Sequence, residues 1–160
     1  MREVHFRGKI LTLVTLERHW EVVEHAAAVA VLAREGKRVL GIRQWRPAVG
    51  LTTWELPAGI IDPGETPEEA AARELAEEGR VRGDLQEITS FYSSPGFTDE
   101  RIHLFEASNL SPAYAPRDPG ELLEISWKEP AVLWEEVRSG RLATSSTTLV
   151  GILHALTPPS

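Results

Sequence analysis

The sequence predicts an α+β fold, a single domain over residues 1–160 in which helices pack on a mixed β-sheet. Segments rich in Val, Ile and Leu outnumber the helical segments, and the two kinds do not alternate strictly. No repeat, linker or low-complexity run divides the 160 residues. A composition with 42% hydrophobic and 26% charged residues is ordinary for a globular domain.

The first half of the chain is predicted to be mainly strands. The runs that favour strands are Ile10–Leu16, Trp20–Glu24, Ala28–Leu32, Val39–Ile42 and a short one near Trp54. Three Pro-containing breaks follow or flank them, at Arg46-Pro47, residues 56–59 and residues 62–64, and each predicts a loop.

The clearest helix signal begins at Thr66. Thr66 is a favourable N-cap, Pro67 occupies the first helical position, and Glu69 completes a capping box. The run Glu68–Glu78 contains only Ala, Leu, Glu and Arg, which are all strong helix formers.

The second half mixes strands and helices. Expected strands are Gln86–Tyr92, Arg101–Ala107 and Leu122–Lys128, and expected helices are Pro130–Ser139 and Thr147–Leu156. Loops are expected at Ser93–Asp99 and Ala113–Gly120. The hydroxyl residues 145–148 are interpreted only as the cap of the last helix.

Composition limits the function classes. With 17 Lys and Arg against 24 Asp and Glu, the net charge of −7 argues against nucleic acid as a partner. There is no Cys, the longest apolar stretch (Ala26–Ala33) is too short to span a membrane, and the N-terminus lacks a secretory signal. We therefore expect a cytoplasmic protein with no membrane partner, in which any bound phosphate would need a cation.

Three carboxylates share one face at the end of the first helix. Glu74, Glu77 and Glu78 stand at i, i+3 and i+4, where like charges repel, and the last helical turn disfavours anions. A divalent cation would reverse both effects, and Mg²⁺ favours one or two carboxylates together with substrate phosphates. The plain alternative is a solvated acidic helix face.

The spacing around these glutamates favours the metal site. Gly59, Glu65, Arg73 and the three glutamates are followed by Val81, and the segment 59–81 resembles the 23-residue box of Nudix hydrolases. One position departs, because Arg80 stands where the family has Gly. Either Arg80 adopts positive φ or Gly79 ends the helix one residue early; we expect the first, since it preserves the register of Val81.

The resemblance implies a Nudix-type α/β/α sandwich with a mixed sheet and a catalytic loop–helix–loop. It also implies that two or three Mg²⁺ (or Mn²⁺) ions hold a substrate diphosphate, whose hydrolysis they assist. The implied metal ligands are Glu74, Glu78, Glu77 and the backbone carbonyl of Ala58. Among the implied catalytic residues, Arg73 holds a carboxylate in place, and Glu65 supports a ligand or is a further ligand.

Features outside the box indicate a subfamily. Residues 54–59 and 43–50 are similar to segments of ADP-ribose pyrophosphatases, and Pro95 lies fourteen residues beyond Val81, where those enzymes have a proline. The resemblance implies hydrolysis of ADP-ribose to AMP and ribose 5-phosphate by a homodimer. The alternatives are another nucleoside diphosphate sugar or NADH as substrate, and a non-catalytic nucleotide-sensing module.

Several residues are candidates for contact with substrate. Arg46 suits a phosphate or a ribose hydroxyl, although a surface salt bridge is the plain alternative. The remaining candidates are Glu21 for adenine or ribose, Ser94, Pro95 and Gly96 over the terminal ribose, and Glu100 near the metals. For the general base we expect Glu121, on a Pro- and Gly-rich loop, with Glu100 and then Glu77 as alternatives.

Overall fold

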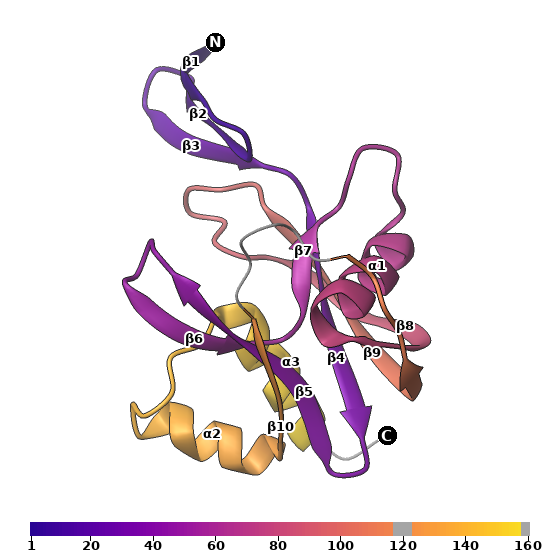
Figure 1. Ribbon diagram of the computed structural model, residues 1–160. Coiled ribbons are helices and arrows are strands. Elements are labelled where there is room, and N and C mark those ends of the chain that lie inside the picture. Colours follow the sequence, from indigo (N-terminus) through magenta and orange to yellow (C-terminus); the bar gives the residue numbers. More distant parts are fainter. Residues whose placement is uncertain (117–122, 158–160) are drawn as a thin grey trace.

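The computed structural model describes residues 1–116 and 123–157, and these residues form two β-sheets and three helices (Figure 1). The larger sheet has the order β10-β5-β4-β9-β8, with β6 paired to β5 and β7 paired to β4. Its strands are β4 (Ala28–Glu35), β5 (Arg38–Arg46), β6 (Leu51–Glu55), β7 (Ala58–Ile60), β8 (Val81–Tyr92), β9 (Arg101–Pro112) and β10 (Glu124–Lys128). Because β4 and β9 run parallel and the other pairs antiparallel, the predicted mixed sheet is confirmed.

Strand β4 is the centre of the fold, because its apolar run is buried on both faces. Ala28, Ala30 and Leu32 face a core that includes Leu133 of α2 (Pro130–Arg138) and Ile152 of α3 (Ser146–Leu156). Residues 29, 31 and 33 face a second core that includes residues 70, 71 and 75 of α1 (Pro67–Gly79). Figure 1 shows α1 on one side of the sheet with α2 and α3 on the other, which is the predicted α/β/α sandwich.

A separate three-stranded antiparallel sheet precedes the sandwich and projects from it in Figure 1. It contains β1 (Arg2–Arg7), β2 (Leu11–Leu16) and β3 (Trp20–His25). The sequence analysis did not predict β1, because its charged and exposed residues lack an apolar run; pairing with β2 forms the strand. The sheet exposes large apolar side chains, among them Phe6 and Trp20, which are 56% and 58% exposed.

Other strand boundaries differ from expectation for the same reason. Residues 58 and 59 are predicted to lie in a loop, yet together with Ile60 they form β7, because the backbone of Ala58 pairs with Ala30 of β4. Strand β8 begins at Val81 rather than at Gln86, and β9 continues to Pro112 rather than ending at Ala107. The two extensions pair with each other through a bulge between Arg82 and Asp84, which the polar sequence does not reveal.

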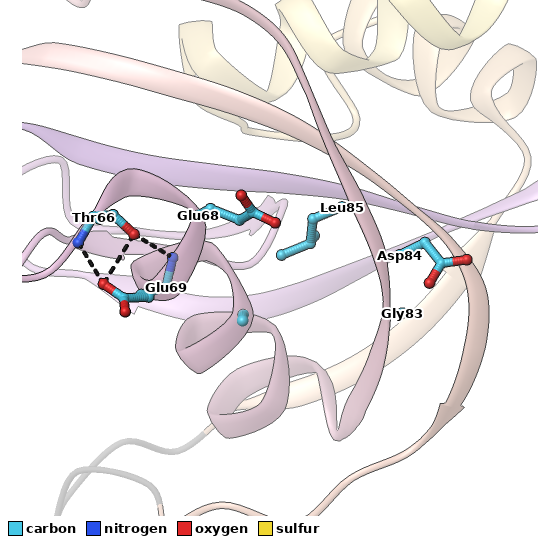
Figure 2. A pocket seen from close by; sticks show the side chains of 7 residues that line it. Thr66, Glu68, Glu69, Gly83, Asp84 and Leu85 are labelled. Atoms are coloured by element: carbon cyan, nitrogen blue, oxygen red, sulfur yellow. Dashed lines mark hydrogen bonds between the residues drawn. The ribbon is translucent and has the colours of Figure 1, made fainter.

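The first helix begins as predicted. Thr66 accepts a hydrogen bond from the backbone N–H of Glu69, whose carboxylate in turn accepts one from the N–H of Thr66 (Figure 2). This first turn borders a cavity of about 660 Å³ whose other wall is Gly83, Asp84 and Leu85 of β8. On the helix, the residues that line this cavity all precede Glu74, Glu77 and Glu78. No helix in the two described ranges is long and apolar enough to cross a membrane.

Candidate active site

The glutamates near the end of α1 face the short strand β7. Glu78 Oε2 accepts a hydrogen bond of 2.8 Å from the backbone N–H of Ala58. The Glu74 carboxylate lies so close to Gly59 that a Cβ there would be 1.9 Å from Oε1. Both side chains are buried, with residue exposures of 8% for Glu74 and 5% for Glu78. Two carboxylates therefore meet two adjacent residues of β7, and only glycine at position 59 leaves room for them.

Arg73 joins this carboxylate pair to the loop before the helix. Its Nε and Nη2 donate to the two oxygens of Glu65 at 2.8 and 2.9 Å, and Nη2 also donates to the carbonyl of Ile60. Its Nη1 donates to Glu74 at 2.5 Å and lies 3.5 Å from Glu77. The hydrogen bonds from Arg73 lower the pKa of Glu65 below its ordinary value, and those to Glu65 and Glu74 raise the pKa of Arg73. The guanidinium thus contacts three of the candidate carboxylates.

The end of α1 follows the first of the two predicted alternatives. Arg80 has φ 59° and ψ 26°, the left-handed conformation, while Gly79 remains inside the helix. At Gly79 a Cβ would come within 3.1 Å of the Leu75 side chain and 3.3 Å of the Leu40 side chain, so a larger residue would require both to shift slightly. The Arg80 guanidinium donates to the carbonyl of Ala115, and the Arg80 carbonyl accepts from the N–H of Ala113.

A cavity of about 310 Å³ adjoins β7. It is lined by three of the residues that the sequence predicts at the site, Arg46, Ala58 and Glu100, and by Gly59. It also contains residues that the sequence analysis did not assign to a site: His25, Glu55, Ser145, Thr147 and Thr148. The hydroxyl residues do cap α3, because Ser145 accepts from the N–H of Thr148, and they line the cavity as well.

In this cavity Arg46 is paired across the hairpin of β5 and β6. Its Nε and Nη2 donate to the two oxygens of Glu55 at 3.0 and 2.8 Å, and the hydroxyl of Thr53 donates to Glu55 at 2.6 Å. Burial raises the pKa of Glu55, but the hydrogen bonds from Arg46 and Thr53 outweigh it, so the pKa lies below its ordinary value. Glu55 therefore stays ionised and fixes the Arg46 fork at the cavity wall.

A second cavity, of about 550 Å³, lies between β3 and the loop of residues 93–99. It brings together Glu21, Pro95 and Gly96, all three expected at a substrate site, beside the aromatic residues Trp20, Tyr92 and Phe97. Ser94 instead closes the loop, since its carbonyl accepts from the N–H groups of Phe97 and Thr98.

Glu121, the residue expected to be the general base, lies outside the described residues. Trp54 is fully buried and its indole N–H donates to the hydroxyl of Ser126, so it belongs to the core. Gly41 makes room for it, because a Cβ there would be 2.1 Å from the Trp54 ring.

Comparison with known proteins agrees with this geometry. Residues 23–145 match the NUDIX domain family. The chain is 46% identical over 137 residues to the ADP-ribose pyrophosphatase of Bacillus subtilis, covering 78% of this chain and 74% of that protein. It is 35% identical over 144 residues to the ADP-ribose pyrophosphatase of Mycobacterium tuberculosis, covering 86% and 69%.

A crystal structure of an ADP compounds hydrolase has the same fold, with a TM-score of 0.79 at 20% identity, over 96% of this chain and 88% of that one. The family match and the two ADP-ribose pyrophosphatase relatives thus define a pyrophosphohydrolase. The chain belongs to the Nudix hydrolase family, in which divalent metals are generally used.

Proposed function

We propose that this chain hydrolyses ADP-ribose: water adds to one phosphorus of the diphosphate, the P–O–P bridge breaks, and AMP and ribose 5-phosphate leave. The family membership and the two ADP-ribose pyrophosphatase relatives support this substrate. The observation that carries the proposal is the packing of the Glu74 and Glu78 carboxylates against Ala58 and Gly59, at the wall of the cavity that holds Arg46.

The donor set fits magnesium or manganese. Glu74, Glu78 and Glu77, with the Ala58 carbonyl, offer hard oxygen ligands. Among the described residues no three acidic or histidine side chains lie close enough together to hold a metal ion by themselves. Such a set is not required, because Mg²⁺ keeps several waters and shares its shell with substrate phosphates. When bound, two or three such ions would neutralise the diphosphate and lower the pKa of the attacking water.

Arg73 and Glu65 support this set. Arg73 contacts Glu65, Glu74 and Glu77, so it holds the carboxylates in place when no cation is there. Because the fork of Arg73 binds both oxygens of Glu65, the loop before α1 and the acidic face of α1 move as one unit.

The two cavities suit different parts of an ADP-ribose molecule. Arg46, which lines the cavity beside Ala58, would bind the phosphates, and Glu100 would contact the groups next to them. Glu21 would contact adenine or a ribose, and the loop of Ser94, Pro95 and Gly96 would lie over the terminal ribose. There Trp20, Tyr92 and Phe97 supply flat apolar surface suited to a base or a ribose.

We assign the general base to Glu121, in the Pro- and Gly-rich segment of the sequence before β10, with Glu100 and then Glu77 as alternatives. The helix glutamates would coordinate the cations and would therefore be poor proton acceptors. A separate base would then accept the proton of the attacking water. Replacing Glu121 with Gln should lower kcat sharply and leave KM nearly unchanged, because only an interaction of the transition state is lost. Full kcat in that variant would move the base to Glu100.

We further infer a homodimer formed through the N-terminal sheet. Its exposed apolar side chains, Phe6 and Trp20 among them, form a surface that a second copy would cover. Since Trp20 and Glu21 also line the second cavity, the partner would lie beside the substrate. Light scattering after size exclusion should give twice the chain mass, and Phe6→Asp should reduce it to one; a monomeric wild type contradicts the inference.

The function is tested with a panel of ADP-ribose, NADH, UDP-glucose and nucleoside triphosphates in the presence of Mg²⁺. Products are measured as inorganic phosphate after treatment with a phosphatase. ADP-ribose should exceed the others at least about tenfold in kcat/KM, a difference of about 1.4 kcal/mol in transition-state binding. Equal rates would reject ADP-ribose as the preferred substrate and favour a Nudix hydrolase of another nucleoside diphosphate. If no compound were hydrolysed, the chain would be a nucleotide-sensing module.

A further inference from the structure

His25 stands where the N-terminal sheet joins the sandwich. It is the last residue of β3, three positions before the central strand β4 begins at Ala28. Its side chain is 16% exposed and lines the cavity that also holds Arg46, Ala58 and Glu100. The loop of residues 93–99 is called the substrate loop below. Its end, with Glu100 after it, lies along this part of β3.

Several contacts tie that loop to β3. The N–H of Val23 donates to the carbonyl of Phe97 at 2.7 Å, and Val23 forms a parallel bridge with Thr98. The backbone N–H of His25 donates to Asp99 Oδ1 at 2.8 Å. Both anchoring points on β3 make these contacts with backbone N–H groups, so they do not depend on the imidazole.

The imidazole makes a different contact. Its Nδ1 lies 2.7 Å from the carbonyl of Ala26 and 3.3 Å from Glu100 Oε1. The Ala26 carbonyl accepts the hydrogen of Nδ1, and Glu100 Oε1 lies farther from the same nitrogen, as an electrostatic contact and not as a second hydrogen bond. The Ala26 carbonyl fixes the ring plane, and the ring in turn faces the Glu100 carboxylate, which is 25% exposed.

We propose that His25 is a positioning residue for substrate binding, whose ring, with Nδ1 3.3 Å from Glu100 Oε1, holds that carboxylate in the cavity beside Ala58 and Gly59. The proposal rests on the function inferred above, because it takes Glu100 as a substrate contact. It adds that the end of the N-terminal sheet, and not only the loop of Glu100 itself, sets the orientation of that contact. Without the ring, Glu100 can rotate toward solvent.

The experiment compares two isosteric replacements with a truncation. In His25→Asn the side-chain NH₂ occupies the place of Nδ1, whereas in His25→Gln it reaches toward the place of Nε2. We expect KM for ADP-ribose to rise about five- to tenfold in His25→Gln and His25→Ala, to stay within about twofold in His25→Asn, and kcat to stay within about twofold in all three. His103→Ala, which removes a histidine of β9 paired with Glu87 of the edge strand β8, serves as the control and should leave KM unchanged.

A double-mutant cycle with Glu100→Ala separates positioning from direct contact. If His25 acts through Glu100, His25→Ala adds no further loss in the Glu100→Ala background. The proposal is overturned if the loss persists there, because His25 then contacts substrate itself, or if His25→Asn behaves like His25→Gln. It is overturned equally if no His25 variant changes KM. The variants are compared on the substrate that the wild type hydrolyses best, so failure with ADP-ribose alone rejects the substrate and not the positioning.

Discussion

Arg73 and Glu65 form an ion pair in which two guanidinium nitrogens each donate to a different carboxylate oxygen, at 2.8 and 2.9 Å. The pair connects the acidic face of α1 to the loop before it, and the remaining guanidinium nitrogen contacts Glu74 and Glu77. Only Arg offers this planar fork, because the Lys ammonium is a point charge on a flexible stem.

Arg73→Lys should therefore keep the charge and lose the geometry. We expect kcat/KM to fall by about 10- to 100-fold, the range found when residues that orient metal ligands are replaced. Steady-state kinetics at several Mg²⁺ concentrations measures the change. The matched control is Arg138→Lys at the exposed pair with Glu135, which should have no effect. Wild-type kcat/KM in Arg73→Lys would show that the fork is not needed.

Glu78→Gln separates charge from packing. The Gln side chain keeps an oxygen to accept from the Ala58 N–H, but removes the negative charge and its repulsion with Glu74. We expect turnover to fall by about two orders of magnitude or more, since a metal ligand is lost. The melting temperature measured without metal should not fall. A clear drop in the melting temperature of Glu78→Gln would make this glutamate structural.

Local signals predicted the parts of the fold that local interactions form. The capping box of Thr66 and Glu69 involves residues within one turn, so the sequence contains its full cause, whereas the left-handed Arg80 was expected from the register of the family box. Strand β7 has no such local cause. Pro57 and Gly59 favour a loop, and only the pairing with β4, some thirty residues away, makes residues 58–60 a strand.

The same distinction applies to the site. The three glutamates were found because helical spacing places them on one face. Thr148 was interpreted as a cap, yet its hydroxyl also accepts from the N–H of Leu56, a residue 92 positions earlier, so it lines the cavity. His25 was missed because its approach to Glu100 depends on β3 lying along the substrate loop. The sequence pattern of one segment does not predict which distant segment it contacts in the fold.

The Arg80 position predicts a stability difference between two small residues. Arg80→Gly and Arg80→Ala both remove the hydrogen bond to the Ala115 carbonyl, but only Ala retains a Cβ in the left-handed conformation. We expect Arg80→Gly to be more stable than Arg80→Ala by about 1 kcal/mol in urea unfolding. Equal stabilities would mean that the helix end relaxes out of the left-handed region in Arg80→Ala.

Glu55 predicts a dependence of stability on pH. Its pKa in the folded state lies below the ordinary value of 4.5, despite the opposing effect of burial, because Arg46 and Thr53 donate hydrogen bonds to the carboxylate. A carboxylate with a lowered pKa contributes stability that is fully present above its unfolded pKa and is lost as pH falls through the folded pKa. The loss therefore begins below about pH 4.5.

Replacing Glu55 with Gln isolates this contribution from those of other carboxylates. At pH 7 the variant should be less stable than wild type, since Gln offers Arg46 a single uncharged acceptor in place of two charged oxygens. As pH falls from 5 to 3, the difference between the two urea midpoints should shrink, because wild-type Glu55 is then protonated while the variant has nothing to titrate there. Midpoints that fall in parallel over this range would show that Glu55 contributes no pH-dependent stability.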